Sequence, residues 1–314
     1  WEDGECPHPS EVRRTLGPSM NDWIEPSLVT ISILKLLQLP GVEPVKLSTF
    51  IRSIRDKARN CDIMEIFFRH NSQVKASRYI RKASKDAERI LEECRIQQIS
   101  IISLADAAYP RELGEISDAP PVLYVRGRCS DFNEKTITVV ETSQASPRGI
   151  SMARLIAKTI VQGGFTVVSG LALGIDTAAH QSALDENGRT IAVLAHGLDT
   201  VAPSSNRHLA DQIVQRGGVL LSEHPPGFPP YPAEFVRRNR MQSGLSLGSI
   251  IVESGREGGA IHHARFAVSQ KRKLYVGFPT RKEVNETFRR EGAEYLIAEH
   301  HAIPLRNTGD LKKV

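Results

Sequence analysis

The sequence predicts an α/β fold with a doubly wound, mostly parallel sheet, preceded by a small all-helical domain. After Ile99, short apolar runs rich in valine and isoleucine alternate with helix-length segments, the pattern of a parallel sheet covered by helices on both faces. Before Ile99, apolar residues recur at helical spacing among alternating charges, which is typical of amphipathic helices.

The amino-terminal third divides into two parts. Residues 1–27 contain proline and glycine without apolar periodicity, so we expect an irregular lead-in. We assign residues 28–98 to the helical domain, because a helix-length apolar stretch begins at Leu28 and helical spacing continues beyond the Pro40-Gly41 break. Its basic residues could form a face for nucleic acid, but acidic residues interleave with them, which favours a solvated surface.

Residues 99–308 are expected to form the larger domain, and residues 309–314 a tail. The predicted strands share short runs of apolar residues and cover residues 122–125, 137–140, 165–168, 191–194, 219–221, 250–252 and 274–276. The predicted helices between them begin near Gly149, Asp176, Asn206, Arg238, Ala260 and Asn285. Ligands of such sheets bind beyond the carboxyl ends of the strands, so the loops there are the candidate sites.

Composition limits the class of protein. The 314 residues carry a formal net charge of +5, which permits a polyanionic partner without requiring one. The 4 cysteines are far apart and form no CxxC pair, so we expect reduced thiols and neither a zinc ribbon nor a disulfide framework. No apolar run approaches the roughly 18 residues of a membrane span, and the first residues lack signal-peptide features. We therefore expect a soluble, cytoplasmic protein with no membrane partner.

The first candidate loop follows the predicted strand that ends at residue 168. Its small residues, Ser169, Gly170, Ala172 and Gly174, would let the backbone approach a ligand. The helix that follows would present unpaired amides to phosphate. The same pattern fits a tight strand-to-helix turn in which Asp176 is the N-cap, and the residues leave both interpretations open.

Nucleotide cofactors and catalysis are disfavoured by the motifs that are missing. The first loop is not GxGxxG, no acidic residue ends the next strand, and no P-loop is present, so we expect no cofactor. Adjacent His262 and His263 would point about 100° apart on a helix and chelate poorly, so we expect no metal. The absence of a GxSxG elbow disfavours a nucleophilic hydrolase. We predict no catalytic residues and favour a non-catalytic binding protein.

The second candidate is a cluster of basic and aromatic residues, Phe235, Arg237, Arg238, Asn239 and Arg240. Guanidinium groups suit phosphate oxygens, asparagine can contact a base or a phosphate, and Phe235 offers a stacking face. Single-strand binders use this combination. The proline-rich segment before the cluster would position it, so we favour a binding role over a merely solvated one.

The third candidate is the loop after the strand predicted at residues 250–252. Gly258 and Gly259 precede a predicted helix, so this loop is expected to form a second anion-binding nest of backbone amides.

Motifs in this order resemble the DprA/Smf family of DNA-processing proteins. They are SGLALGIDTAAH, then IAVLAHGLD with Pro203 and Asn206, then LLSEHPPG, FVRRNRMQSGLS and VES, and the resemblance covers residues 107–304. It implies a Rossmann-like domain that forms a homodimer, binds single-stranded DNA, and helps load a RecA-type recombinase in transformation or recombination. The helical domain resembles the family's SAM-like domain loosely.

The resemblance implies nucleic-acid contacts at specific positions of this sequence. They are the small residues of the first loop, the glycines of the third, and Asn206, Arg237, Asn239 and Arg240. Lys271 and Arg272 are added for their charge near a strand entrance.

The chain departs from the family at three places, one of which is Ala202 in place of a usual tyrosine before Pro203. Glu141-Thr142-Ser143 stands where the family has a GSR or GTR pattern, and an acidic side chain there would weaken or redirect DNA binding. Gly258, Ala260 and His263 stand where the family usually has Ser, Ser and Thr, which removes hydroxyl donors but keeps backbone amides.

Two other functions stay open on these residues. One is a nucleotide-binding sensor or phosphoribohydrolase-like enzyme, although the PGGxGTxxE motif of those enzymes is incomplete at residues 257–262. The other is an interaction module that has lost its DNA site. Salt-dependent binding to single strands would separate DNA binding from both.

Overall fold

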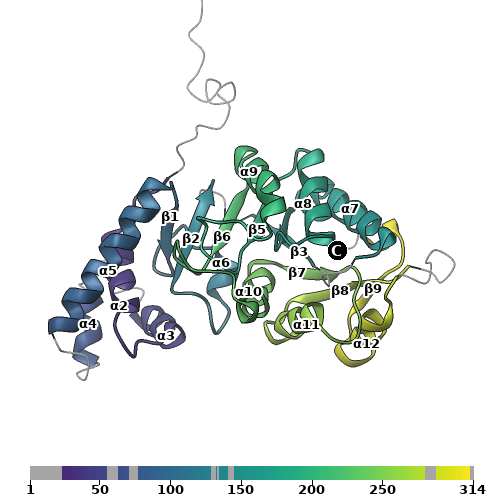
Figure 1. The fold of residues 1–314 in the computed structure, drawn as a ribbon. Coiled ribbons are helices and arrows are strands. Elements are labelled where there is room, and N and C mark those ends of the chain that lie inside the picture. The colour runs from purple at the N-terminus through teal and green to yellow at the C-terminus, as the bar shows by residue number, and fades with distance from the viewer. Residues whose placement is uncertain are drawn as a thin grey trace, which may run out of the picture.

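The computed structural model describes residues 23–54, 63–70, 77–128, 132, 134–140, 145–279 and 288–311. It has the predicted class: one large, mostly parallel sheet lies between two layers of helices, and a group of helices covers one end (Figure 1). In the part of the chain so described, no helix combines the length and apolar character needed to cross a membrane.

The terminal group of helices confirms the predicted helical segment. It comprises α2 (Leu28–Leu37), α3 (Pro44–Ile54), α4 (Ile63–His70) and α5 (Ser77–Ile96). Ser27 caps α2, since its hydroxyl accepts a hydrogen bond from the Thr30 backbone N–H at 3.1 Å. The irregular lead-in predicted at residues 1–27 lies largely outside the described residues.

These helices share a continuous apolar core with the first strands of the sheet. Polar contacts also join the two parts, because the Thr30 hydroxyl donates to Ser103 Oγ at 2.9 Å and the Ser48 hydroxyl donates to the Ala119 carbonyl at 2.7 Å. The boundary at residue 98 remains a prediction.

The nine strands are β1 (Ser100–Ser103), β2 (Val122–Gly127), β3 (Thr136–Val140), β4 (Thr166–Ser169), β5 (Thr190–Val193), β6 (Val219–Ser222), β7 (Gly248–Ile251), β8 (Lys273–Gly277) and β9 (Ile303–Leu305). Their order in the sheet is β1-β2-β6-β5-β4-β3-β7-β8-β9. The β1–β2 and β2–β6 pairs are antiparallel, and the other pairs are parallel. All seven predicted strands are confirmed. Strands β1 and β9 were not predicted. They are the two edge strands of the sheet and are short, with 4 residues in β1 and 3 in β9.

The helices that cover the sheet are α7 (Pro147–Gln162), α8 (Ile175–Asp185) and α9 (Arg207–Gln215) on one face, and α10 (Pro232–Leu245), α11 (Gly259–Ser269) and α12 (Glu291–His300) on the other (Figure 1). The short helices are α6 (Arg111–Gly114), α13 (Thr308–Leu311) and the 3-10 turn η3 (Ser204–Asn206).

One predicted helix start was wrong. Helix α10 begins at Pro232 and not near Arg238. Proline suits the first helical position, because its fixed φ fits a helix and its missing N–H would have no intrahelical partner there. The whole basic cluster therefore lies on a helix. The start predicted near Asn285 lies outside the described residues.

The topology fixes where a ligand would bind. From β3 the chain builds outward through β4, β5 and β6, and then α10 carries it back so that β7 pairs on the other side of β3. The direction of winding thus reverses between β3 and β7. In doubly wound sheets, ligands bind in the crevice at the carboxyl ends of the strands at this switch point.

Candidate functional site

A cleft of about 410 Å³ lies at the switch point. It is lined by Val140 at the end of β3, by Ala172 and Asp176 of the first loop, and by one face of α10. The rest of the lining comes from the third loop, the first turns of α11 and Arg289. Its volume falls in the range of roughly 300–1,000 Å³ that is usual for ligand sites.

The first loop is held in place by Asp176. The carboxylate of Asp176 accepts hydrogen bonds from the backbone N–H groups of Gly170 at 3.0 Å and Ala172 at 3.3 Å. Gly174, with φ 87°, is the N-cap of α8, so the N-cap interpretation of Asp176 was wrong. Burial raises the pKa of Asp176, although nearby Arg238 opposes this shift. Two amides of the predicted phosphate nest are thus already bonded within the protein.

Other residues of this loop also make internal contacts. The Ser169 hydroxyl donates to the Val139 carbonyl at 2.7 Å and is fully buried. The Asn206 side-chain amide donates to the Leu171 carbonyl at 2.8 Å and to Thr177 Oγ1 at 2.9 Å. Asn206 therefore supports the loop from behind and does not line the cleft.

Arg238 is the charged group beneath the first loop. Its guanidinium is buried and donates to the carbonyls of Gly170, at 3.0 Å, and of Val193. A Cβ atom at position 170 would overlap this guanidinium. Glycine is therefore needed at this position because the backbone lies close to Arg238, a residue of the same protein.

Helix α10 divides the basic cluster between two sides. Consecutive residues of a helix point about 100° apart. Phe235, Arg238 and Asn239 line the cleft, and the Asn239 amide donates to the Gly259 carbonyl at 3.2 Å, which joins α10 to the third loop. Arg237 and Arg240 point away from the cleft, toward Glu223.

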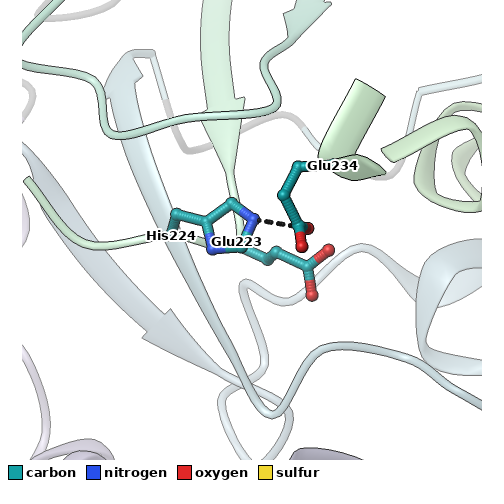
Figure 2. Close-up of side chains that lie close together, drawn as sticks. All are labelled: Glu223, His224 and Glu234. Carbon is teal, nitrogen blue, oxygen red and sulfur yellow. Dashed lines mark hydrogen bonds and ion pairs between the residues drawn. The ribbon is translucent and has the colours of Figure 1, made fainter. Parts of the chain in front are cut away.

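Figure 2 shows the group that receives these two arginines: Glu223 and His224, which follow β6, and Glu234 in the first turn of α10. His224 Nε2 lies 3.0 Å from Glu234 Oε2. Their ligand atoms lie within 4.8 Å of one another, a spacing that a cation could use. However, Arg240 Nη2 lies 2.6 Å from Glu223 Oε2, and Arg237 lies 3.7 Å from Glu223 and 3.8 Å from Glu234. The arginines already neutralise both carboxylates, so we assign a structural ion-pair cluster.

The structure places the remaining basic candidates elsewhere. Lys271 and Arg272 precede β8 and therefore lie at the amino ends of the strands, the edge opposite the cleft. Arg272 Nη1 pairs with Glu112 Oε2 at 2.7 Å, and Nη2 donates to the Gly244 carbonyl at 3.2 Å. They do lie at a strand entrance, as expected, but away from the cleft, and their contact with nucleic acid stays a prediction.

The third loop is open to the cleft. Gly258 has φ 115° and is the N-cap of α11, a conformation that favours glycine. Gly258 and Gly259 are exposed, and a Cβ atom on either would meet no described atom within 4 Å. This backbone can therefore approach a ligand directly.

Several residues that line the cleft were not predicted as site residues, among them Gln242, His263 and Arg289. Gln242 could have been noticed as a polar residue facing the sheet from α10, while His263 was considered as a poor metal ligand and as a departure from a usual threonine, but not as a site residue. The departure predicted at Glu141 and Ser143 lies outside the described residues.

Comparison with known proteins agrees with this architecture. The family model of DNA recombination-mediator protein A matches residues 100–313. Protein Smf of Synechocystis is 38% identical over 240 residues, which cover 71% of this chain and 60% of that protein. DNA processing protein DprA of Bacillus subtilis is 36% identical over 189 residues, 60% of this chain and 63% of that protein. The chain thus spans less than two thirds of the length of these relatives.

Two solved structures have the same fold. The crystal structure of DprA from Streptococcus pneumoniae has a TM-score of 0.70 and 27% identity, covering 90% of this chain and 96% of that one. The solved structure of DNA processing protein A from Helicobacter pylori has a TM-score of 0.60 and 24% identity, covers 69% of this chain and 94% of that one, and agrees in fold. From the family match over most of its length, the chain belongs to the family of DNA recombination-mediator protein A, as its motifs predicted.

Proposed function

We propose that this protein binds single-stranded DNA in the cleft between β3 and β7 and acts as a non-catalytic DNA-processing protein. The observation that carries the proposal is the composition of the cleft. It combines an aromatic face at Phe235, the cations Arg238 and Arg289, and the open backbone of Gly258 and Gly259. Aromatic faces stack bases, while cations and backbone amides hold phosphates, and single-strand binders use both.

The finer roles rest on family membership. We propose that the protein protects single strands, loads a RecA-type recombinase and forms a homodimer. The related Helicobacter pylori protein is described as binding single-stranded DNA, which supports this choice of ligand.

The test is the affinity for a fluorescent oligothymidine of about 20–35 nucleotides, compared with a matched duplex at two salt concentrations. We expect binding that prefers the single strand and weakens as salt rises, because phosphate contacts release counterions. An absence of binding at low salt would overturn the proposal and favour a nucleotide sensor or an interaction module.

Arg237, which points away from the cleft on the exposed side of α10, tests whether a bound strand extends beyond the cleft along this helix. Its side chain is 43% exposed and lies 3.7–3.8 Å from its carboxylate partners, so it can turn toward a phosphate with little loss. We expect Arg237→Ala to weaken single-strand binding several-fold and to make the slope of log affinity against log salt shallower by about 0.7, the value for one phosphate contact on a single strand. Titrations at four or five salt concentrations measure this slope.

The matched control is Lys158→Ala, which also removes one exposed positive charge. Lys158 lies near the carboxyl end of α7, which places it near the amino ends of the strands and far from the cleft. Its Nζ pairs with Glu186 Oε1 at 2.7 Å. Equal changes in the two variants would show that net charge alone attracts the strand.

A further inference from the structure

The floor of the cleft contains polar groups that the protein itself leaves without partners. Gln242, on α10, is 1% exposed, and neither its side-chain nitrogen nor its side-chain oxygen has a hydrogen-bond partner among the described residues. His263, on α11, is also 1% exposed, and its Nδ1 has no partner within the same set. Both side chains line the cleft.

These free groups are not a sign of loose packing around them. His263 is fixed by a 2.8 Å hydrogen bond between its Nε2 and Ser249 Oγ. The backbone of Gln242 is fixed as well, since its carbonyl accepts a hydrogen bond from Thr138 Oγ1 at 2.8 Å. Buried side-chain amides in native proteins almost always have partners, because a buried unpaired amide is costly. A buried, unpaired carboxamide that lines a cavity is therefore placed for a partner from outside the chain.

The chemistry beside Gln242 suits a neutral ligand group, while Arg238 and Arg289 supply the positive charge of the same cleft. Burial and the nearby charge of Arg238 lower the pKa of His263 to about 3, so the imidazole is uncharged at neutral pH. The carboxyl group of Asp176 also lines the cleft and would repel an anion when ionised. The rim is different, because the exposed backbone of Gly258 and Gly259 suits phosphate there.

The carboxamide of Gln242 presents a donor and an acceptor side by side. Every nucleobase carries an adjacent donor and acceptor on its Watson–Crick edge, which is free in a single strand, and glutamine pairs with such edges through two hydrogen bonds. Phe235, which lines the same cleft, offers a ring face for the base plane.

We infer that the cleft admits one nucleobase, whose edge hydrogen-bonds to the Gln242 carboxamide while its phosphate stays at the glycine-rich rim. This inference rests on the proposed function for its source of nucleobase, a DNA strand. A free nucleotide carries the same base and phosphate, so the experiment must separate the two sources.

The experiment compares an oligothymidine of about 20 nucleotides with an abasic strand of equal length, and adds thymidine monophosphate and adenosine monophosphate in a thermal-shift assay. The wild-type protein should bind the strand with bases about tenfold more tightly than the abasic strand, the effect of one good bidentate contact. Gln242→Met, which keeps the side-chain length, should reduce this ratio to between one and three and leave the affinity for the abasic strand unchanged.

Stability provides a second readout. Gln242→Met should raise the unfolding midpoint, because it removes a buried amide that has no described partner. Gln242→Glu keeps the shape but loses the donor, so it should lose the preference for bases even if the methionine variant folds poorly. Gln181→Leu, which replaces an exposed amide on α8, is the control. It should leave the ratio of the affinities for the two strands unchanged.

Equal affinity for the two strands, or an unchanged ratio in both Gln242 variants, would overturn the inference while leaving strand binding intact. Stabilisation by a mononucleotide without binding of either strand would support the nucleobase pocket and overturn the proposed function. If neither strands nor mononucleotides bind, both are overturned.

Discussion

Arg238→Ala is expected to lower the free energy of unfolding by about 3–5 kcal/mol, the usual result of removing one member of a buried charged group. The guanidinium bonds to the carbonyls of Gly170 and Val193 and lies near the buried Asp176 carboxyl group. The substitution leaves these acceptors buried and unpaired and removes support from the first loop. Single-strand binding should be lost with it. Urea unfolding followed by circular dichroism measures the first effect, and oligothymidine binding the second.

Arg237→Ala is the matched control for stability, because Arg237 is adjacent to Arg238 in the sequence but its side chain is exposed. It should change the free energy of unfolding by no more than about 0.5 kcal/mol. A loss below about 1 kcal/mol for Arg238→Ala would mean that the loop does not depend on this residue.

Lowering the pH from 7 to 5 is expected to destabilise the protein strongly through two buried histidines. Burial, with a contribution from Arg238, lowers the pKa values of His180 and His263 from 6.5 to about 3. Their contribution to stability is therefore complete above pH 6.5, and it is lost as the pH falls toward 3, because only the unfolded chain takes up the protons. Each histidine gives a slope of about 1.4 kcal/mol per pH unit, and the pair costs about 4 kcal/mol by pH 5.

The urea midpoint measured between pH 7 and pH 5 tests this expectation. His263→Asn should remove about half of the slope. His262→Asn, at the exposed neighbouring position, should leave the slope unchanged. If stability changes with pH to the same extent in both variants and in the wild-type protein, the pH dependence belongs to groups other than His263.

The strands could be predicted because each central strand is buried on both faces and reads as an apolar run. The edge strand β9 escaped prediction because its burial is incomplete and its 3 residues carry no pattern. The start of α10 was misplaced because the preceding prolines resemble an irregular segment, whereas Pro232 opens the helix.

The site was only partly predictable, for a physical reason. Small residues at Gly170 and Ala172 indicate a close approach, but the sequence does not say to what, and the approaching group at Gly170 is Arg238 from a distant segment. Adjacent arginines also suggest one basic surface, although a helix must turn Arg237 and Arg240 away from the cleft. Whether the Gln242 amide finds a partner depends wholly on tertiary packing.

The late arrival of β7 beside β3 matters for synthesis on the ribosome. A nascent chain that has emerged only as far as β6 can already pair β3, β4, β5 and β6, but the outer edge of β3 is then bare. A bare edge of apolar residues is a template for association with other chains. The next segments, α10 and β7, cover that edge and form the first part of the cleft, whose lining the third loop, α11 and Arg289 then complete. Protection of the β3 edge and assembly of the cleft therefore begin in the same step of translation.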